Sequence, residues 1–404
     1  MMERIRQVAE STSVVIKFPP KLLSSYETFI TKNAGAVGQV EGALRSLTYI
    51  IPGRFRETEL ASESLNSSVQ LLSLYHDSLL SRALAQSLPR RKQYQSPHNR
   101  YTRFYCQKSA TYRRTAVTLQ VIQYTELLLE MMAKRRGEKA KWRVVVVLEA
   151  VKAMCRLILM RLTNSRPLLS PPLPEREVVD EELAAQQQQQ QQGQEEERHI
   201  DSPPSERSER SETGSETWTM PRTSLTLPPL PSSEDISSYL LSKVLTADDI
   251  KPPKALMHRT TGLGELAEIL YIIRPVIYAT AMAYWTTPNP DGTPRGRGKA
   301  DWRPWLLGLS IEYGARQLAK RELETRRPGG ARGLTMLEKE ELKRRGWALG
   351  WWGMRGAFYE NITRGVIKGV VGRLKGKVVL DMVGSVMEDY DFLWDEYYFP
   401  TATL

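Results

Sequence analysis

Apolar residues recur at three- and four-residue spacing over most of the chain outside its middle. Val37, Val40, Leu44 and Leu47 follow this spacing in the first such segment, and the period is that of one face of an α-helix. Pro52-Gly53 then predicts the end of that helix. The same pattern predicts helices over 62–84, 115–137, 141–162, 236–246, 263–286, 303–327, 335–382 with an interruption, and 386–397. The predicted fold class is all-α.

The segment 141–162, KWRVVVVLEAVKAMCRLILMRL, contains a run of valines that alone could form a buried strand. Its length and the spacing of Glu149, Lys152 and Arg156 favour a helix with a broad apolar face and a narrow polar stripe. Two interpretations fit it. It is either a core helix of a soluble bundle or a helix of a membrane assembly, from Trp142 on, whose charges face protein.

The segment 261–285 is the most apolar of the chain, yet it holds Arg274 and Pro275 at its centre. Proline should kink a helix here, and an arginine in the hydrocarbon centre costs about 2.5–3.5 kcal/mol on insertion scales. A pairing of Arg274 with Glu268, or with Glu149 on the other helix, would lower this cost. The sequence of this segment, which ends at Trp285, favours a core, re-entrant or interfacial helix over a simple transmembrane span.

Residues 166–235 interrupt the helical pattern with Pro-rich, Gln-rich and Ser/Glu-rich sequence. Few large apolar residues occur there, so burial cannot offset the entropy of ordering the chain. We therefore predict a disordered acidic, polyglutamine-containing linker between an N-terminal helical region, 1–165, and a C-terminal one, 236–404. Net charge follows this division, with +14, −9 and +6 in the three parts.

The net charge of +11 indicates an anionic partner, either nucleic acid or an acidic membrane surface. Residues 78–125 contain no acid at all, and tyrosines are interleaved with the basic residues. Such a patch can bind single-stranded nucleic acid or an anionic membrane surface, or it can be a solvated loop. Its candidate residues are Arg90, Arg91, Lys92, Arg100, Arg103, Arg113 and Arg114.

Catalytic and metal-binding patterns are poorly represented. The four histidines are scattered, and the two cysteines form no CxxC motif. No HExxH motif, P-loop or nucleophile elbow occurs. We expect no enzyme activity, no cofactor and no metal.

Four blocks taken together resemble the peroxin-16 family, most closely its filamentous-fungal members. They are the stretch from YETFITKNAGAVGQVEGALRSLTYIIPGRF to SLYHDSLL, then WRVVVVLEAVKAMCRLILMRL, HRTTGLGELAEILYIIRPVIYATAMAYW and DWRPWLLGLSIEYGARQL. A Tyr-rich end follows them. The blocks occur in the family's order and span nearly the whole chain outside the linker.

The resemblance implies a non-catalytic protein of peroxisome biogenesis at the peroxisomal membrane, and in some lineages at the endoplasmic reticulum. It implies a scaffold or receptor for newly made membrane proteins, with peroxin-3 and peroxin-19 type partners, membrane lipid and no nucleic acid. One alternative is a peripheral membrane protein that controls peroxisome division. An alternative of another class is a soluble, basic nucleic-acid-binding protein.

The resemblance also marks residues for structural roles. These are Glu41, Pro52, Gly53, Arg54, Glu63, Asp77, Glu268, Arg274, Pro275, Trp302, Pro304, Trp305 and Glu312.

Overall fold

Helices make up the described part of the chain, which contains no β-strand. The computed structural model describes residues 20–50, 59–87, 96–176, 251–289, 291, 293, 295–326, 333–374, 384, 387 and 390–402. Most of the region predicted as a linker, the helix predicted at 236–246, and Pro52, Gly53, Arg54, Arg90, Arg91 and Lys92 lie outside these residues. The all-α prediction is confirmed.

The N-terminal part contributes six helices: α2 (Pro20–Lys32), α3 (Ala34–Ile50), α4 (Glu59–Ser87), α5 (Pro97–Lys108), α6 (Ala110–Lys134) and α7 (Glu138–Leu162). The Val run therefore lies in a helix, as the spacing of its charges predicted. Ser96 and Ser109 cap α5 and α6, each accepting a hydrogen bond from a backbone N–H of the first turn.

The C-terminal part contributes α11 (Leu263–Thr286), α12 (Trp302–Arg326), α13 (Met336–Gly350), the single turn α14 (Gly356–Phe358) and α15 (Arg364–Leu374). A 3₁₀ turn at Trp351–Met354 and a π-helical turn at Tyr359–Thr363 interrupt the segment that was predicted as a broken helix. Further 3₁₀ turns are Pro253–Leu256, Gly298–Ala300 and Phe399–Thr401.

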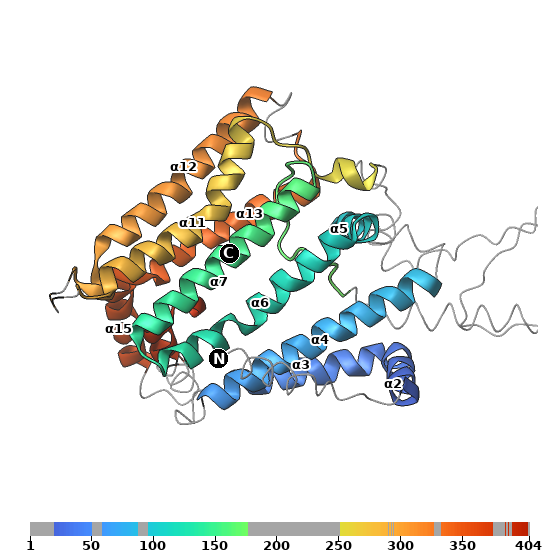
Figure 1. Cartoon of the computed structure of the whole chain (residues 1–404), viewed down its shortest axis with the longest axis horizontal. Coiled ribbons are helices and arrows are strands. Elements are labelled where there is room, and N and C mark those ends of the chain that lie inside the picture. Colours follow the sequence, from blue (N-terminus) through green and yellow to red (C-terminus); the bar gives the residue numbers. More distant parts are fainter. Residues whose placement is uncertain are drawn as a thin grey trace, which may run out of the picture. The chain divides into compact units, whose positions relative to one another are not determined.

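The long helices α4, α6, α7, α11 and α12 are successive neighbours (Figure 1). Helix α13 packs on the side of α11 that carries Glu268. Helix α11 bends near its middle (Figure 1), where Pro275 removes a backbone donor from the helix interior. Parts of the chain far apart in sequence thus share one core.

Ionic pairs are buried between these helices. The guanidinium of Arg274, 1% exposed, pairs with the fully buried carboxylate of Glu312 on α12. Glu312 was not among the two carboxylates that the sequence analysis considered, Glu268 and Glu149. Glu268 instead accepts two 2.7 Å hydrogen bonds from Arg345 of α13.

The other carboxylate, Glu149, binds Lys152, which lies one turn further along the same helix. The ammonium of Lys152 also reaches Glu126 of α6, at 2.8 Å. The charged side chains at the centre of α7 thus pair inside the protein.

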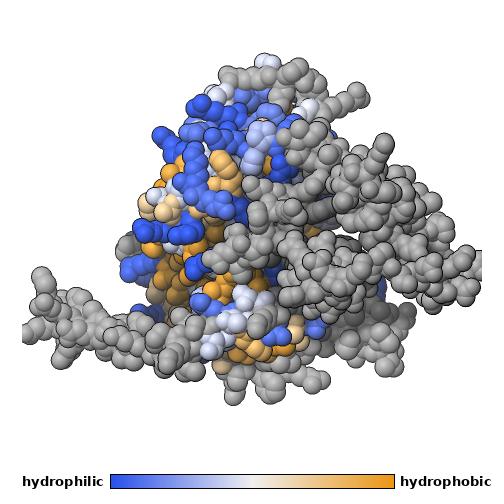
Figure 2. All heavy atoms as spheres, turned by 90° about the vertical axis from the view of Figure 1, so that its right-hand side faces the viewer, coloured by the Kyte–Doolittle hydropathy of each residue, from blue (hydrophilic) through white to orange (hydrophobic). Residues whose placement is uncertain are grey.

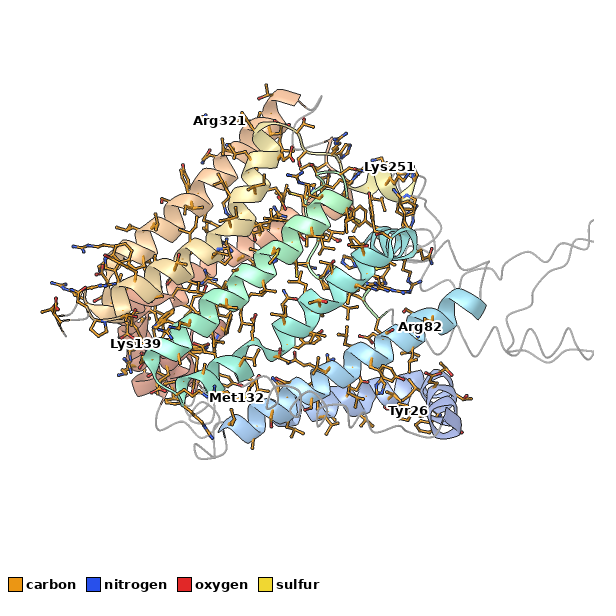
Figure 3. The ribbon with its side chains drawn as sticks, in the orientation of Figure 1. Tyr26, Arg82, Met132, Lys139, Lys251 and Arg321 are labelled. Carbon is orange, nitrogen blue, oxygen red and sulfur yellow. The ribbon has the colours of Figure 1, made fainter. Side chains whose placement is uncertain are left out.

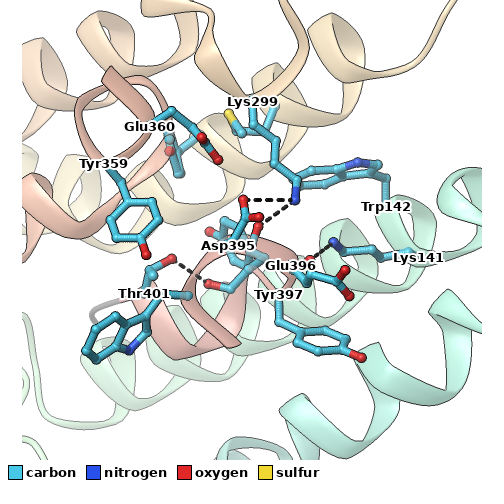
Figure 4. Close-up of a pocket in the computed structure, with 14 residues that line it drawn as sticks. Lys141, Trp142, Lys299, Tyr359, Glu360, Asp395, Glu396, Tyr397 and Thr401 are labelled. Atoms are coloured by element: carbon cyan, nitrogen blue, oxygen red, sulfur yellow. Dashed lines mark hydrogen bonds and ion pairs between the residues drawn. The ribbon is translucent and has the colours of Figure 1, made fainter. Parts of the chain in front are cut away.

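The C-terminal tail packs against this core and binds residues that lie more than 250 positions earlier in the sequence. The Glu130 carboxylate accepts backbone N–H bonds from Tyr398 at 2.7 Å and from Phe399 at 3.0 Å. Lys141 donates to the carbonyl of Glu396, and Lys299 interacts with Asp395 beside it (Figure 4). Tyr398 and Phe399 then pack in the core with Trp142 and Tyr278.

A second polar cluster joins the N-terminal helices. Glu41 of α3, 6% exposed, is bound by His76 Nδ1 and accepts a 2.9 Å hydrogen bond from Ser73. Arg176 reaches both Glu41 and Asp77. Burial alone would raise the pKa of Glu41, but its hydrogen bonds with His76 and Ser73 and the charge of Arg176 lower the pKa below its ordinary value.

We expect Arg274→Met or Glu312→Leu to lower the free energy of unfolding by about 3–5 kcal/mol, because each removes one charge of a buried ion pair and leaves the other less well compensated. The double substitution should restore most of this loss, because two apolar side chains then replace the pair. Thermal and denaturant unfolding followed by circular dichroism measures the cycle. Removing both charges of the exposed pair Lys320–Glu324 on α12 is the matched control, with an expected change within about 0.5 kcal/mol. A double variant no better than the single ones would contradict the pairing.

We expect Glu41→Gln to destabilise the protein at pH 7 by about 1–2 kcal/mol, with the difference shrinking as the pH falls below about 4.5. A carboxyl whose pKa is lower in the folded state stabilises the fold above its unfolded pKa and loses that effect as it becomes protonated. Melting temperatures of both proteins from pH 7 to pH 3.5 measure this. Glu340→Gln, at an exposed position of α13, is the control. A difference independent of pH would show that the charge of Glu41 does not matter.

Candidate functional site

Helix α7 exposes an apolar stripe along one side. Val147, 59% exposed, Ala150, Met154, 56% exposed, and Ile158 follow one another at spacings of three and four residues. The charged residues at the centre of α7, Glu149 and Lys152, are on the other, buried side. An exposed stripe of this composition on a helix with buried charges reverses the usual order of a soluble protein.

Helix α11 carries a second stripe of the same kind. Leu266 is exposed, and the half-exposed Leu270, Ile273 and Ile277 follow it at helical spacing. Tyr284, 56% exposed, extends the stripe near the end of the helix.

Thr280 is the polar residue of the α11 stripe. Its hydroxyl donates back to carbonyls of its own helix, those of Val276 and Ile277, at 2.9 Å. A threonine bonded in this way presents little unsatisfied polarity. The stripe therefore remains apolar in character along its length.

The two stripes lie on the same side of the helix layer. Val147 of α7 and Thr280 of α11 line one open, shallow hollow of about 560 Å³ between the two helices, together with Val146 and Ala283. The combined surface, called the apolar face, consists of Val147, Ala150, Met154, Ile158, Leu266, Leu270, Ile273, Ile277, Thr280 and Tyr284. Figure 2 shows exposed hydrophobic patches among hydrophilic side chains on the side of the molecule that it displays.

Basic residues mark both ends of the α7 stripe. Arg143 and Arg161 are exposed on the same side of the helix as Val147 and Ile158. Eighteen residues at a rise of 1.5 Å separate them by about 27 Å. Lys139 adds a third positive charge at the N-terminal end of α7 (Figure 3). Arginine and lysine at the edge of an apolar surface suit the headgroup region of a membrane.

The predicted membrane-helix residues lie beneath this face rather than on it. Trp142, Lys152, Glu268, Arg274 and Pro275 are buried, and Arg156 and Trp285 are half-buried. The charges that argued against membrane contact are therefore shielded by protein. By length and composition, α11 is the one helix in the described residues that could cross a membrane, and half of its most apolar window is buried.

The predicted basic patch divides into two environments. Arg113 and Arg114 are exposed at the start of α6, whereas Arg100 and Arg103 of α5 are half-buried. The interleaved tyrosines Tyr101, Tyr105 and Tyr112 are at most 3% exposed and pack together in a core cluster. These three tyrosines cannot stack with bases in this position, so they do not supply the aromatic platforms of a single-strand binder.

The residues marked by the resemblance take structural positions where the structure describes them. Glu41, Asp77, Glu268, Arg274 and Glu312 belong to the ionic clusters described above. Trp302, Trp305 and Phe358 pack ring against ring, and the Trp305 indole donates to the carbonyl of Trp352 at 2.9 Å. Pro304 is buried in α12 and Glu63 is half-buried in α4.

Sequence reasoning missed Glu126, Glu130, Arg345 and the tail residues Tyr398 and Phe399. A carboxylate inside an otherwise apolar helix such as 115–137 is a signal that a buried partner exists. The identity of that partner can depend on contacts between segments far apart in sequence, as for Glu130 and the tail, and periodicity does not reveal these.

Comparison with known proteins identifies the family of the chain. The model of the family described as "Peroxisomal membrane protein (Pex16)" matches residues 24–396. The Peroxisomal membrane protein PEX16 of Schizosaccharomyces pombe is 22% identical over 310 residues, which cover 76% of this chain and 78% of that protein. No solved structure matches the chain. Since the family match spans nearly all of the sequence, the chain belongs to the Pex16 family of peroxisomal membrane proteins.

Proposed function

We propose that this protein acts in peroxisome biogenesis as a non-catalytic scaffold that lies flat on the peroxisomal membrane through its apolar face. Family membership supports the compartment and the process. The single observation that carries the mode of attachment is the apolar face itself. Its side chains are exposed or half-exposed in the isolated chain, and the charges at the centres of the same helices are paired inside the protein.

The other side of the helix layer argues for a flat orientation. Helix α13 is joined to α11 by the Glu268–Arg345 pair, and it exposes Lys339, Lys343 and Arg344. An upright α11 that crossed the bilayer would bring these cations to the depth of the hydrocarbon, at a high cost in free energy. With the layer flat, the apolar face enters the membrane interface and α13 stays in water.

The ion pairs between the buried polar residues support the scaffold role. The carboxylates and cations gathered in the interior pair with one another and fix helix positions, which is the chemistry of a rigid platform. We propose that this platform receives newly made membrane proteins together with peroxin-3 and peroxin-19 type factors, at the peroxisomal membrane and also at the endoplasmic reticulum. The family resemblance supports these partners and the second location.

Control of peroxisome division by a peripherally attached protein is the second candidate, and it differs from the scaffold in that the apolar face does not enter the bilayer. Carbonate extraction of isolated peroxisomes, with protease protection before and after detergent, tests the attachment. Release by carbonate would favour the peripheral, division-controlling role. Resistance to carbonate without a protease-protected segment would favour the flat-lying scaffold, whereas protection of a segment that includes α11 would contradict the flat orientation.

We expect Met154→Asp to reduce binding to phosphatidylcholine–phosphatidylethanolamine vesicles about tenfold, and Val147→Asp to act similarly. Each removes about 1 kcal/mol of apolar burial and places a charge in the membrane interface. Flotation of the purified protein with vesicles measures the bound fraction.

Leu342→Asp is the control, because Leu342 is 41% exposed on α13, outside the apolar face. Equal loss of binding in the control and in the face variants would show that the apolar face is not the membrane contact. So would unchanged binding in both face variants.

A further inference from the structure

A groove separate from the apolar face lies between the N-terminal helices. Its walls are α3, α4 and α6, and the segment 171–176 closes one side. Its volume is about 960 Å³. Along α4 it extends from Leu71 to Arg82, and along α6 from Arg113 to Tyr124. Each span is about 17 Å at the helical rise, or about three turns.

The floor of the groove is apolar. Leu71 and Leu74 of α4 and Val117 and Val121 of α6 line it. Gly42 keeps the α3 wall low, because a Cβ added there would meet no atom within 4 Å. Open space above a helical glycine leaves room for a partner's side chain.

The rim of the groove is positively charged. Arg82, Arg113 and Arg114 are exposed on it and form no ion pair with the described residues. Figure 3 shows Arg82 near the end of α4, beside the start of α6. The carboxylates of Glu41 and Asp77, which also line the groove, are already bound by Arg176.

Glu175 is the exposed carboxylate that remains on this rim. The three arginines therefore outnumber it. A rim with this excess of positive charge attracts acidic side chains.

We propose that this groove binds an acidic amphipathic helix of a partner protein. A trough of three helical turns, walled by helices and floored by Leu and Val, fits the apolar face of a helix at spacings of three, four and seven residues. Glu or Asp on the flanks of that helix pairs with Arg82, Arg113 and Arg114. The three arginines set the polarity of the partner, and the aliphatic floor sets its shape.

The chemistry of the floor separates this partner from nucleic acid. Single-stranded nucleic acid is held by a series of aromatic platforms. Tyr75 and Tyr124 are the aromatic residues that line this groove, whose other apolar lining is mainly Leu, Val and Pro. The nearby tyrosines Tyr101, Tyr105 and Tyr112 are buried. The concave shape likewise separates the groove from a membrane contact. The proposal rests on the groove alone and stands whether or not the apolar face binds lipid.

The test uses a fluorescent 18-residue peptide with Leu at one helical face and Glu on both flanks. A peptide of the same composition with a scrambled order is the reference. Fluorescence anisotropy with the full-length protein in mild detergent measures binding. We expect saturable binding of the ordered peptide, at least tenfold tighter than the scrambled one, which weakens as salt is raised.

Two variants test the groove. Gly42→Leu adds a side chain where the Cβ meets no atom within 4 Å, and leucine favours a helix more than glycine does. Binding should therefore fall at least tenfold while the circular dichroism spectrum and melting temperature are kept. Gly42→Ala, which adds one methyl group, is its matched control and should bind within about twofold of the wild type. In the variant that combines Arg113→Glu with Arg114→Glu, the affinity for the ordered peptide should also fall at least tenfold.

Arg135→Glu with Arg136→Glu is the matched control for charge, because this adjacent pair lies exposed at the other end of α6. The proposal is overturned if the Gly42→Leu variant binds the ordered peptide like the wild type. It is also overturned if the double variant at Arg113 and Arg114 and the double variant at Arg135 and Arg136 lose affinity for the peptide equally. A third outcome would also overturn it. The protein would bind a single-stranded oligonucleotide or an anionic vesicle more tightly than the ordered peptide, and Arg113→Glu with Arg114→Glu would abolish that binding.

Discussion

The cost of burying charge governs this fold. Arg274 and Lys152 lie near the centres of α11 and α7, and each is almost completely removed from solvent. Taking such ions out of water is repaid only by close partners. Glu312 on α12 supplies the partner for Arg274, and Glu126 and Glu149 supply those for Lys152. These pairs set which helix faces lie inward, and the same choice turns the apolar stripes of α7 and α11 outward.

The C-terminal tail also binds a buried charge, and it thereby joins the N-terminal and C-terminal parts of the described core. Glu130 is fully buried in α6, and backbone N–H groups of Tyr398 and Phe399 bind its carboxylate. A carboxylate in the core of the N-terminal part is thus satisfied by residues near the end of the C-terminal part. The segment between the two parts differs in composition from both, yet the two parts form one structure and not two independent domains.

The sequence was sufficient for the features that depend on local physics. Helical spacing identified α4, α6, α7, α11 and α12, and the spacing of Glu149, Lys152 and Arg156 decided between helix and strand for the Val run. Glu312 was not recognised as a partner of Arg274 because many carboxylates were present and only packing selects among them.

The position of the candidate membrane contact could not be predicted from the sequence for a related reason. Composition marked α7 and α11 as a whole, but their central charged residues proved to be on the inward side and an aliphatic stripe of each on the outward side. Which side of a helix faces outward is decided by its neighbours. The tyrosines near the basic patch show the same limit, because a pattern typical of stacking platforms became part of the core.

The apolar face and the groove attract their partners through different forces. Apolar burial is nearly independent of ionic strength, whereas attraction by exposed arginines is screened within about 8–10 Å at physiological salt. A protein held to a membrane through the first kind of contact can exchange partners through the second without leaving the surface. The separation is possible because the central cations of α7 and α11 are neutralised inside the protein, while exposed arginines gather where the N-terminal helices form the groove. The network of buried pairs therefore determines where the apolar face and the groove lie, as well as the stability of the fold.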